Sequence, residues 1–512
     1  MSKKHARDET SPLIKRKLWI DTDCMVDRED GNLISGRADQ DDGFALVAML
    51  HLPALFDVVG VSSVFGNGPG ASTYASLTKL IVKHDTIDVK GEPPNETGSL
   101  PIPQRKVFLG ASEFLQTRTN ASAFEHDNIH EKVQTDASIA IVRQLEGIYA
   151  ANQKHGAVEE KLTILAIGPV TNIASAILLI QATHADNPTM AHNLINVIEK
   201  VVVCGGYRKE GQLSRVGSKQ SGMPVPGVKK PSDFADMNFD FDVLAVQTLL
   251  QTAGLHVVMA GYEAATSFWF TQERLAELVK HGDRAIKYVA STDAVNAWVN
   301  IIWKHNFGNW WDPELNGGKG GDSGQPIPGF HCFDLITAMT MVVPELLPSW
   351  EGPTYVKVLP LVPTEQLAPS SRTGPDATLA NPSTVRVPMP PVATSPHNAL
   401  SFSHAWHHTS FQVTKMFVIC PNPAEKDQHH GGMLASAKVT YVKGLEPSLP
   451  AGCGVEPTDT QLRRECLAEI IMKVLEKPLS VEETHAILDK ARGFGGESKA
   501  PAGKKPRRGK QA

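Results

Sequence analysis

The residues KLWIDTD (17–23) and DQDDGFALVAMLHLP (39–53) decide the fold of this 512-residue chain. The apolar run Leu18–Ile20 is typical of a buried parallel strand, and it leads directly into Asp21 and Asp23. Open α/β sheets bind ligands at the carboxyl ends of their strands. We therefore expect these two carboxylates at a functional site.

A second acidic group precedes the next element. Asp39, Asp41 and Asp42 stand before the apolar-periodic segment Phe44–Leu50, so we expect them at a helix N-terminus. A helix dipole favours one or two such charges, but gathering all these carboxylates is costly unless a cation neutralises them. Oxygen ligands select a hard ion such as Ca²⁺ or Mg²⁺. Solvated acidic loops flanking a helix cap are the alternative for this stretch alone.

Short β-rich runs then alternate with longer helical patterns. The expected strands are 58–64, 107–109, 162–167 and 201–204, and the expected helices are 72–83, 138–149 and 172–179. Such alternation predicts βαβ units, and hence an α/β fold with a mainly parallel sheet flanked by helices.

Composition narrows the class of protein. A hydrophobic fraction of 41% suffices for a large core, and a formal net charge of −5 argues against a nucleic-acid-binding body. The six cysteines form no CxxC pair, which favours reduced thiols in a cytosolic protein. We find no membrane-spanning run and no signal peptide, so we expect a cytoplasmic protein. The basic run Lys504–Lys510 leaves a nuclear location open.

Five further segments, in order, resemble landmarks of one family. They are VVGVSSVFGN (58–67), LTILAIGPVTNIASAI (162–177), VVVCGGY (201–207), ADMNFDFD (235–242) and FHCFDLITA (330–338). Together with DTD and DDGFAL, which are similar to a DxDxGxDD signature, they resemble the inosine-uridine nucleoside hydrolase family from residue 18 to about 340. The resemblance implies calcium-dependent cleavage of a ribonucleoside into ribose and free base.

The resemblance also assigns the metal site. It implies that Asp23 both ligates Ca²⁺ and acts as general base, and that Asp42 and Asp334 are carboxylate ligands. The backbone carbonyl of Ile167 would complete the protein ligands, and Asp21 would support the site from behind. Ile stands at 167 where the family has Thr, which matters little for a backbone ligand.

Substrate-binding residues follow in the same way. The set implied by the resemblance is Asp41 at the ribose 2′-hydroxyl, with Asn67, Gln212, Asp236, Asn238 and Asp334. Asp236 and Gln212 replace Glu and Asn of the family, so their reach differs by one methylene, which affects accurate placement. Taken singly, Asn67 or Asn238 could instead be a turn residue bonded to its own backbone.

The leaving base has a distinctive environment. Phe333 precedes Asp334 where many family members have His, and this resembles the purine-preferring branch, in which stacking activates the base. Phe124 or His126 would form the opposite wall, and His331 could act as a donor. A core aromatic beside a strand end is the alternative for Phe333.

The expected domains include material beyond the family. They are a disordered arm (1–16), a nucleoside hydrolase-like domain (17–443) with insertions near 24–40, 214–232 and 360–396, a helical extension (444–495) and a basic disordered tail (496–512). Capping boxes at 458–461 and 480–483 predict two amphipathic helices in the extension, which either dock on the core or mediate self-association.

Two local patterns have competing interpretations. The 17-residue insertion 24–40 replaces three residues of the family; it is expected as a loop near the pocket, or alternatively as a calcium loop of its own. Five histidines could bind a transition metal or simply lie at the surface: His404, His407, His408, His429 and His430.

The sequence therefore predicts a purine-preferring, Ca²⁺-dependent nucleoside hydrolase. A pyrimidine or broad-specificity hydrolase is one alternative, and a non-catalytic ligand-binding or scaffold protein that keeps the fold is the other. The expected partner is a nucleoside, with no nucleic acid and no membrane, and with homo-oligomerisation open because the family is commonly oligomeric.

Overall fold

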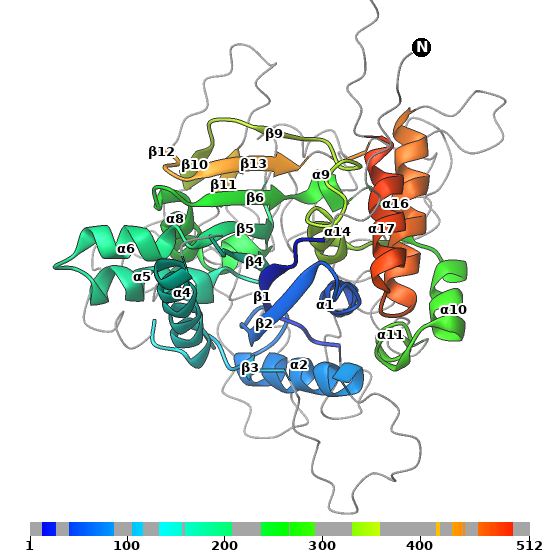
Figure 1. Cartoon of the computed structure of the whole chain (residues 1–512), viewed down its shortest axis with the longest axis horizontal. Coiled ribbons are helices and arrows are strands. Elements are labelled where there is room, and N and C mark those ends of the chain that lie inside the picture. The colour runs from blue at the N-terminus through cyan, green and yellow to red at the C-terminus, as the bar shows by residue number, and fades with distance from the viewer. Residues whose placement is uncertain are drawn as a thin grey trace, which may run out of the picture.

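An eight-stranded sheet forms the centre of the computed structural model (Figure 1). The structure describes residues 13–26, 40–85, 105–115, 133–155, 159–206, 237–265, 267–291, 330–358, 416–419, 433–442, 444–445 and 459–494. In spatial order the strands are β3 (Val107–Phe108), β2 (Phe56–Ser63), β1 (Arg16–Thr22), β4 (Leu162–Ala166), β5 (Ile198–Cys204), β6 (His256–Ala260), β13 (Lys438–Val442) and β9 (Ser349–Glu351). Neighbours are parallel except for the antiparallel pair β13 and β9.

The order of the strands reverses at β1. The chain passes from β1 to β2 and β3 on one side, and then returns to place β4, β5 and β6 on the other. Asp21 near the end of β1 lies beside Ser62 of β2 and Ala166 of β4. Ligands of open α/β sheets bind in the crevice at such a switch point, so the topology places the end of β1 at the expected site.

Strand β1 is buried on both faces. Leu18 and Ile20 pack into one hydrophobic cluster, whereas Trp19 packs into the cluster on the opposite face. The first face carries α1 (Asp41–Leu50), α2 (Gly70–Asp85), α10 (Gln272–His281), α11 (Arg284–Val289) and α14 (Phe333–Met339). The second carries α4 (Asp136–His155), α5 (Thr171–Thr183), α6 (Pro188–Ile195) and α8 (Val243–Gln251). This two-sided burial explains the uninterrupted apolar run in β1.

The predicted α/β fold is confirmed, with strands and helices in every range expected from the alternation. Strand β11 (Met416–Ile419) joins β10 (Tyr355–Val358) and β12 (Met433–Leu434) in a separate small sheet. A two-stranded sheet pairs β7 (Trp269–Phe270) with β8 (Phe330–His331). Strands β6, β13 and β9, which complete one side of the main sheet, were not predicted.

The two predicted C-terminal helices are α16 (Asp459–Glu476) and α17 (Val481–Arg492), and Ser480 and Glu483 form the expected capping box. Their buried side chains join the cluster around α1, and Figure 1 shows the pair side by side next to α10 and α11. They dock on the core. Leu462 of α16 is 42% exposed.

Several predictions fall outside the described residues. These are the first twelve residues, the centre of the insertion at 27–39, the insertions near 214–232 and 360–396, the five histidines and the basic tail. The ends of the first insertion are described, and there Cys24, Val26 and Gln40 are buried. Cys24, Cys204, Cys332 and Cys466 are buried thiols that form no disulfide with one another. No helix in the described part of the chain is long and apolar enough to cross a membrane.

Candidate active site

Five buried aspartates lie around the end of β1. Asp21 and Asp23 come from β1 and the residue that follows it, Asp41 and Asp42 begin α1, and Asp334 lies in the first turn of α14. None of the five is more than 6% exposed. Helices α1 and α14 pack against each other, which brings their acidic first turns together.

Three of these carboxylates form a compact group. Asp41, Asp42 and Asp334 each offer an oxygen atom, and these atoms lie within 4.8 Å of one another. Burying three carboxylates so closely is strongly unfavourable without compensating charge. This geometry therefore makes the group a possible metal site.

Asp23 is connected to this group through Asn67. The backbone N–H of Asn67 donates to Asp23 Oδ2 over 2.7 Å, and its side-chain Nδ2 donates to Asp42 Oδ2 over 3.0 Å. Two glycines allow the approach, because an added Cβ would lie 1.9 Å from Asp23 Oδ2 at Gly66 and 2.8 Å from Asp23 Oδ1 at Gly168. The loops after β2 and β4 thus enclose the Asp23 carboxylate.

The electrostatics of the protein alone favour protons on these groups. Burial and the charges of Asp41 and Asp21, opposed by the hydrogen bond from Asn67, together raise the pKa of Asp23 to about 8. Burial, together with the charges of Asp23 and Asp41, raises the pKa of Asp42 well above its usual range. A bound cation would reverse this preference by stabilising the ionised forms.

Asp21 lies behind Asp23 in a polar network that the sequence did not reveal. Asn172 Nδ2 donates to Asp21 Oδ1 over 2.8 Å, and the Ser62 hydroxyl donates to the same oxygen. Burial nevertheless raises the pKa of Asp21 to about 7, and its Oδ2 has no hydrogen-bond partner among the described residues. The one sequence feature that could have indicated this network is the polar residue Asn172, which stands in the apolar segment that follows β4.

Thr22, another residue not predicted, orients Asp42. Its hydroxyl donates to Asp42 Oδ1, while Asn67 holds the other oxygen. Both oxygens of this buried carboxylate are therefore fixed before any ligand binds.

Ile167 and Asn238 meet on the β4 side of the site. Asn238 Nδ2 donates to the carbonyl oxygens of Cys204 over 3.1 Å and of Ile167 over 3.4 Å. The Ile167 carbonyl keeps a second lone pair, whereas the Asn238 amide nitrogen is already used on the backbone. Both hydrogens of the Asn238 amide are therefore engaged by the backbone of the strand ends.

The sequence profile of the inosine-uridine preferring nucleoside hydrolase family matches residues 18–387. The chain belongs to this family. No curated protein matches the sequence significantly.

Similar solved structures include three nucleoside hydrolases. A plant nucleoside hydrolase shares 14% identity with a TM-score of 0.45, covering 91% of this chain and 99% of that one. A purine-preferring ribonucleoside hydrolase from Gardnerella vaginalis shares 16% identity, with a TM-score of 0.40 and coverage of 65% and 82%. An inosine-guanosine nucleoside hydrolase shares 18% identity, with a TM-score of 0.40 and coverage of 68% and 84%.

The residues that the sequence predicts around the base of a nucleoside are only partly described. Phe333 begins α14, is half-buried and packs against the main core cluster, as the core-aromatic interpretation predicts. The backbone of His331 pairs with Trp269, but its side chain lies outside the described atoms. Phe124, His126, Gln212 and Asp236 also lie outside the described residues.

Proposed function

We propose that this member of the nucleoside hydrolase family is a Ca²⁺-dependent N-ribohydrolase that prefers purine nucleosides. The observation that carries the proposal is the group of Asp41, Asp42 and Asp334, with Asp23 joined to it through Asn67. This arrangement lies at the switch point of the sheet, where a sugar could enter from the strand ends.

The chemistry of the ligands supports a hard divalent ion. Three carboxylate oxygens lie within 4.8 Å of one another, and oxygen-only ligands select Ca²⁺ or Mg²⁺. We choose calcium because the resemblance to the nucleoside hydrolase family implies it. We assign Asp23, Asp42, Asp334 and the Ile167 carbonyl as ligands, with Asp41 close enough to take part or to bind the 2′-hydroxyl.

When bound, calcium supplies positive charge that acidifies water and holds the sugar diol. The protein residues then handle the protons. Asp23 takes a proton from the attacking water, whose oxygen adds to C1′ as the bond from C1′ to the base nitrogen breaks. The hydrogen bond from Asn67 holds the Asp23 carboxylate in one orientation, so this general base is positioned before the substrate binds.

The base leaves with the bonding electron pair and must gain a proton. We assign Phe333 as a stacking surface for a purine, because its half-buried ring lies one residue before Asp334 at the start of α14. Stacking of this kind supports protonation of the purine by solvent water, without a dedicated side-chain acid. If His331 donates the proton instead, a pyrimidine nucleoside becomes an equally good substrate.

Ribose release tests the proposal. Purified protein incubated with inosine, guanosine and uridine in the presence of Ca²⁺ should release reducing sugar, faster from the two purine nucleosides. No release from any of the three would contradict the hydrolase assignment and favour a non-catalytic protein. A preference for uridine would contradict purine stacking while leaving the hydrolase assignment in place.

A further inference from the structure

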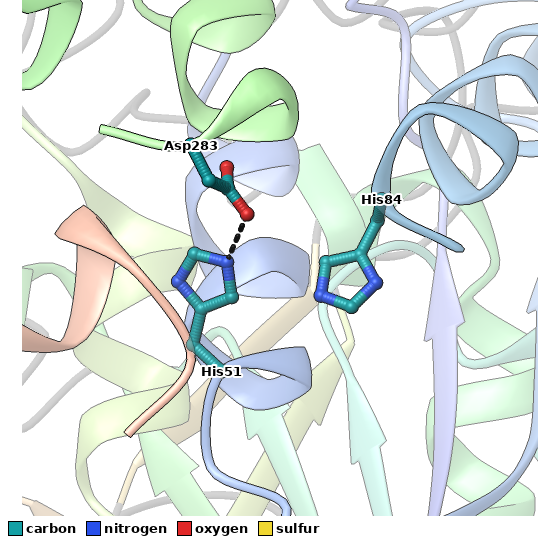
Figure 2. Close-up of side chains that lie close together, drawn as sticks. All are labelled: His51, His84 and Asp283. Atoms are coloured by element: carbon teal, nitrogen blue, oxygen red, sulfur yellow. Dashed lines mark hydrogen bonds and ion pairs between the residues drawn. The ribbon is translucent and has the colours of Figure 1, made fainter. Parts of the chain in front are cut away.

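A second group of metal-binding side chains lies at the opposite end of α1 from the acidic site. His51 directly follows α1, His84 lies in the last turn of α2, and Asp283 caps the N-terminus of α11. Their candidate ligand atoms lie within 4.8 Å of one another, and Figure 2 shows the three side chains facing a common space. None of the three belongs to the proposed active site.

The His51 ring has a defined proton position. Its Nδ1 lies 2.8 Å from the carbonyl oxygen of Val474, and a carbonyl can only accept, so Nδ1 carries hydrogen. Nε2 lies 2.9 Å from Asp283 Oδ2. A neutral ring would present a lone pair to a carboxylate there, so this contact requires a positive species, either an additional proton or a metal ion.

His84 supplies the observation that favours a metal. Its Nε2 is buried and has no hydrogen-bond partner within the described part of the chain, and its side chain is only 9% exposed. In Figure 2 the ring faces His51 and Asp283, and the two imidazole centroids are 5.5 Å apart. A proton shared by His51 and Asp283 would not explain the buried Nε2 of His84, whereas a metal ion would bind the side chains of His51, His84 and Asp283.

The other nitrogen of His84 is held by a carboxylate. Nδ1 lies 3.2 Å from Asp85 Oδ1 and 3.0 Å from Arg105 Nη1. Arg105 Nη1 carries two hydrogens and also lies 2.5 Å from Asp85 Oδ1, so it can donate to both Asp85 and Nδ1. A metal bound through Nε2 would select the other arrangement, in which Nδ1 donates to Asp85 and Nε2 presents its lone pair.

We propose that His51, His84 and Asp283 bind a transition-metal ion, with Zn²⁺ as the best match. Two imidazoles and one carboxylate favour zinc over calcium, and Val474 and Asp85 hold the second ring nitrogens as outer partners of zinc-binding histidines do. Ligands around tetrahedral zinc are about 3.3 Å apart, so the side chains would close by up to about 1.5 Å. Asp283 is 27% exposed on its side chain, which leaves a solvent side for a fourth ligand.

The site would connect the C-terminal helices to the core. Besides the His51 bond to Val474 of α16, Leu479 N–H donates to the His51 carbonyl and Asp283 N–H donates to the Glu476 carbonyl, over 2.9 Å and 2.8 Å. A metal at this position would fix α1, α2 and α11 together under the end of α16. The inference is therefore a structural zinc site, and it does not depend on the proposed catalytic function.

Metal titration of the full chain tests it. Chelator-treated protein is titrated with Zn²⁺ alone, and with Co²⁺ to record visible absorption of the tetrahedral ion. His84→Ala removes one ligand, and Asp283→Asn removes another. The amide oxygen of Asn can still cap α11, because it can accept the hydrogen bond that Ile286 N–H donates to Asp283 Oδ1. His281→Ala is the matched control, because that exposed histidine of α10 pairs only with Glu277 among the described ion pairs.

We expect the wild type and His281→Ala each to bind one more tight equivalent of Zn²⁺ than His84→Ala or Asp283→Asn binds. In these two ligand variants the affinity for Zn²⁺ at this site should fall by a factor of about ten to a hundred or more. Zn²⁺ should raise the melting temperature of the wild type but not of His84→Ala. Circular dichroism identifies any variant that fails to fold. Equal zinc stoichiometry, affinity and thermal response in wild type, His84→Ala and Asp283→Asn would overturn the proposal.

Discussion

Asn67 donates its backbone N–H to Asp23 Oδ2 over 2.7 Å, so the loop after β2 fixes the orientation of the carboxylate that follows β1. Gly66 makes this contact possible, because a Cβ there would lie 1.9 Å from the same oxygen. The relationship links the two neighbouring strands β1 and β2 through a single carboxylate.

Gly66→Ala should displace Asp23 and lower kcat by at least about a hundredfold, since small displacements of a catalytic group are that costly. Gly147→Ala is the matched control: a Cβ at Gly147 meets nothing within 4 Å, and alanine in the middle of α4 should add about 0.5–1 kcal/mol of stability. Ribose-release kinetics and thermal unfolding of both variants check this. Wild-type turnover in Gly66→Ala would show that the Asp23 position does not matter.

The aspartates should make calcium binding depend on pH. Burial raises the pKa of Asp21 to about 7 and that of Asp23 to about 8, so the folded protein holds these protons more tightly than the unfolded chain. The resulting stability is fully present below the ordinary pKa of 3.8 and is lost as the pH rises through 7 to 8. A bound calcium ion would replace these protons, so we expect calcium to bind better at high pH.

We expect Ca²⁺ to raise the melting temperature more at pH 8.5 than at pH 5.5, with the metal-free protein as reference at each pH. Differential scanning calorimetry of chelated and calcium-loaded samples measures both shifts. Equal shifts at the two pH values would mean that the ion does not compete with these protons.

A substitution at Phe333 distinguishes a role in recognising the nucleobase from a role in core packing. Phe333→Leu keeps an apolar side chain but removes the aromatic face, so the ratio of kcat/KM for inosine over uridine should fall about tenfold, since stacking contributes about 1 kcal/mol or more. Melting temperatures measured in parallel report the packing loss. A lower melting temperature with an unchanged substrate ratio would identify Phe333 as a core residue only.

The strands and site segments that could be predicted from the sequence are those marked by local patterns of residues. Apolar runs such as Leu18–Ile20, bounded by polar residues, identify buried strands, and the family landmarks fall at the ends of β1, β2 and β4. Strand β13 escaped prediction because its short run pairs with β6, from His256 onward, through a contact that no local pattern encodes. Long-range pairing depends on the whole sheet.

The side-chain partners were harder to predict than the backbone. The close grouping of Asp41, Asp42 and Asp334 depends on how α1 packs on α14, and the role of Asn172 depends on the distance between two loops. His51 and Asp283 are 232 residues apart, with no spacing motif to connect them. Such contacts follow from tertiary packing and not from residue spacing.

The most direct test of the central claim is ribose release by wild type and Asp23→Asn after removal and return of calcium. Chelation should abolish the wild-type activity and added Ca²⁺ should restore it, whereas Asp23→Asn should lose about 10²–10⁴-fold in kcat with its melting temperature preserved. Full turnover in chelator, or wild-type turnover in Asp23→Asn, would contradict the claim that buried carboxylates hold a divalent ion and activate water at this site.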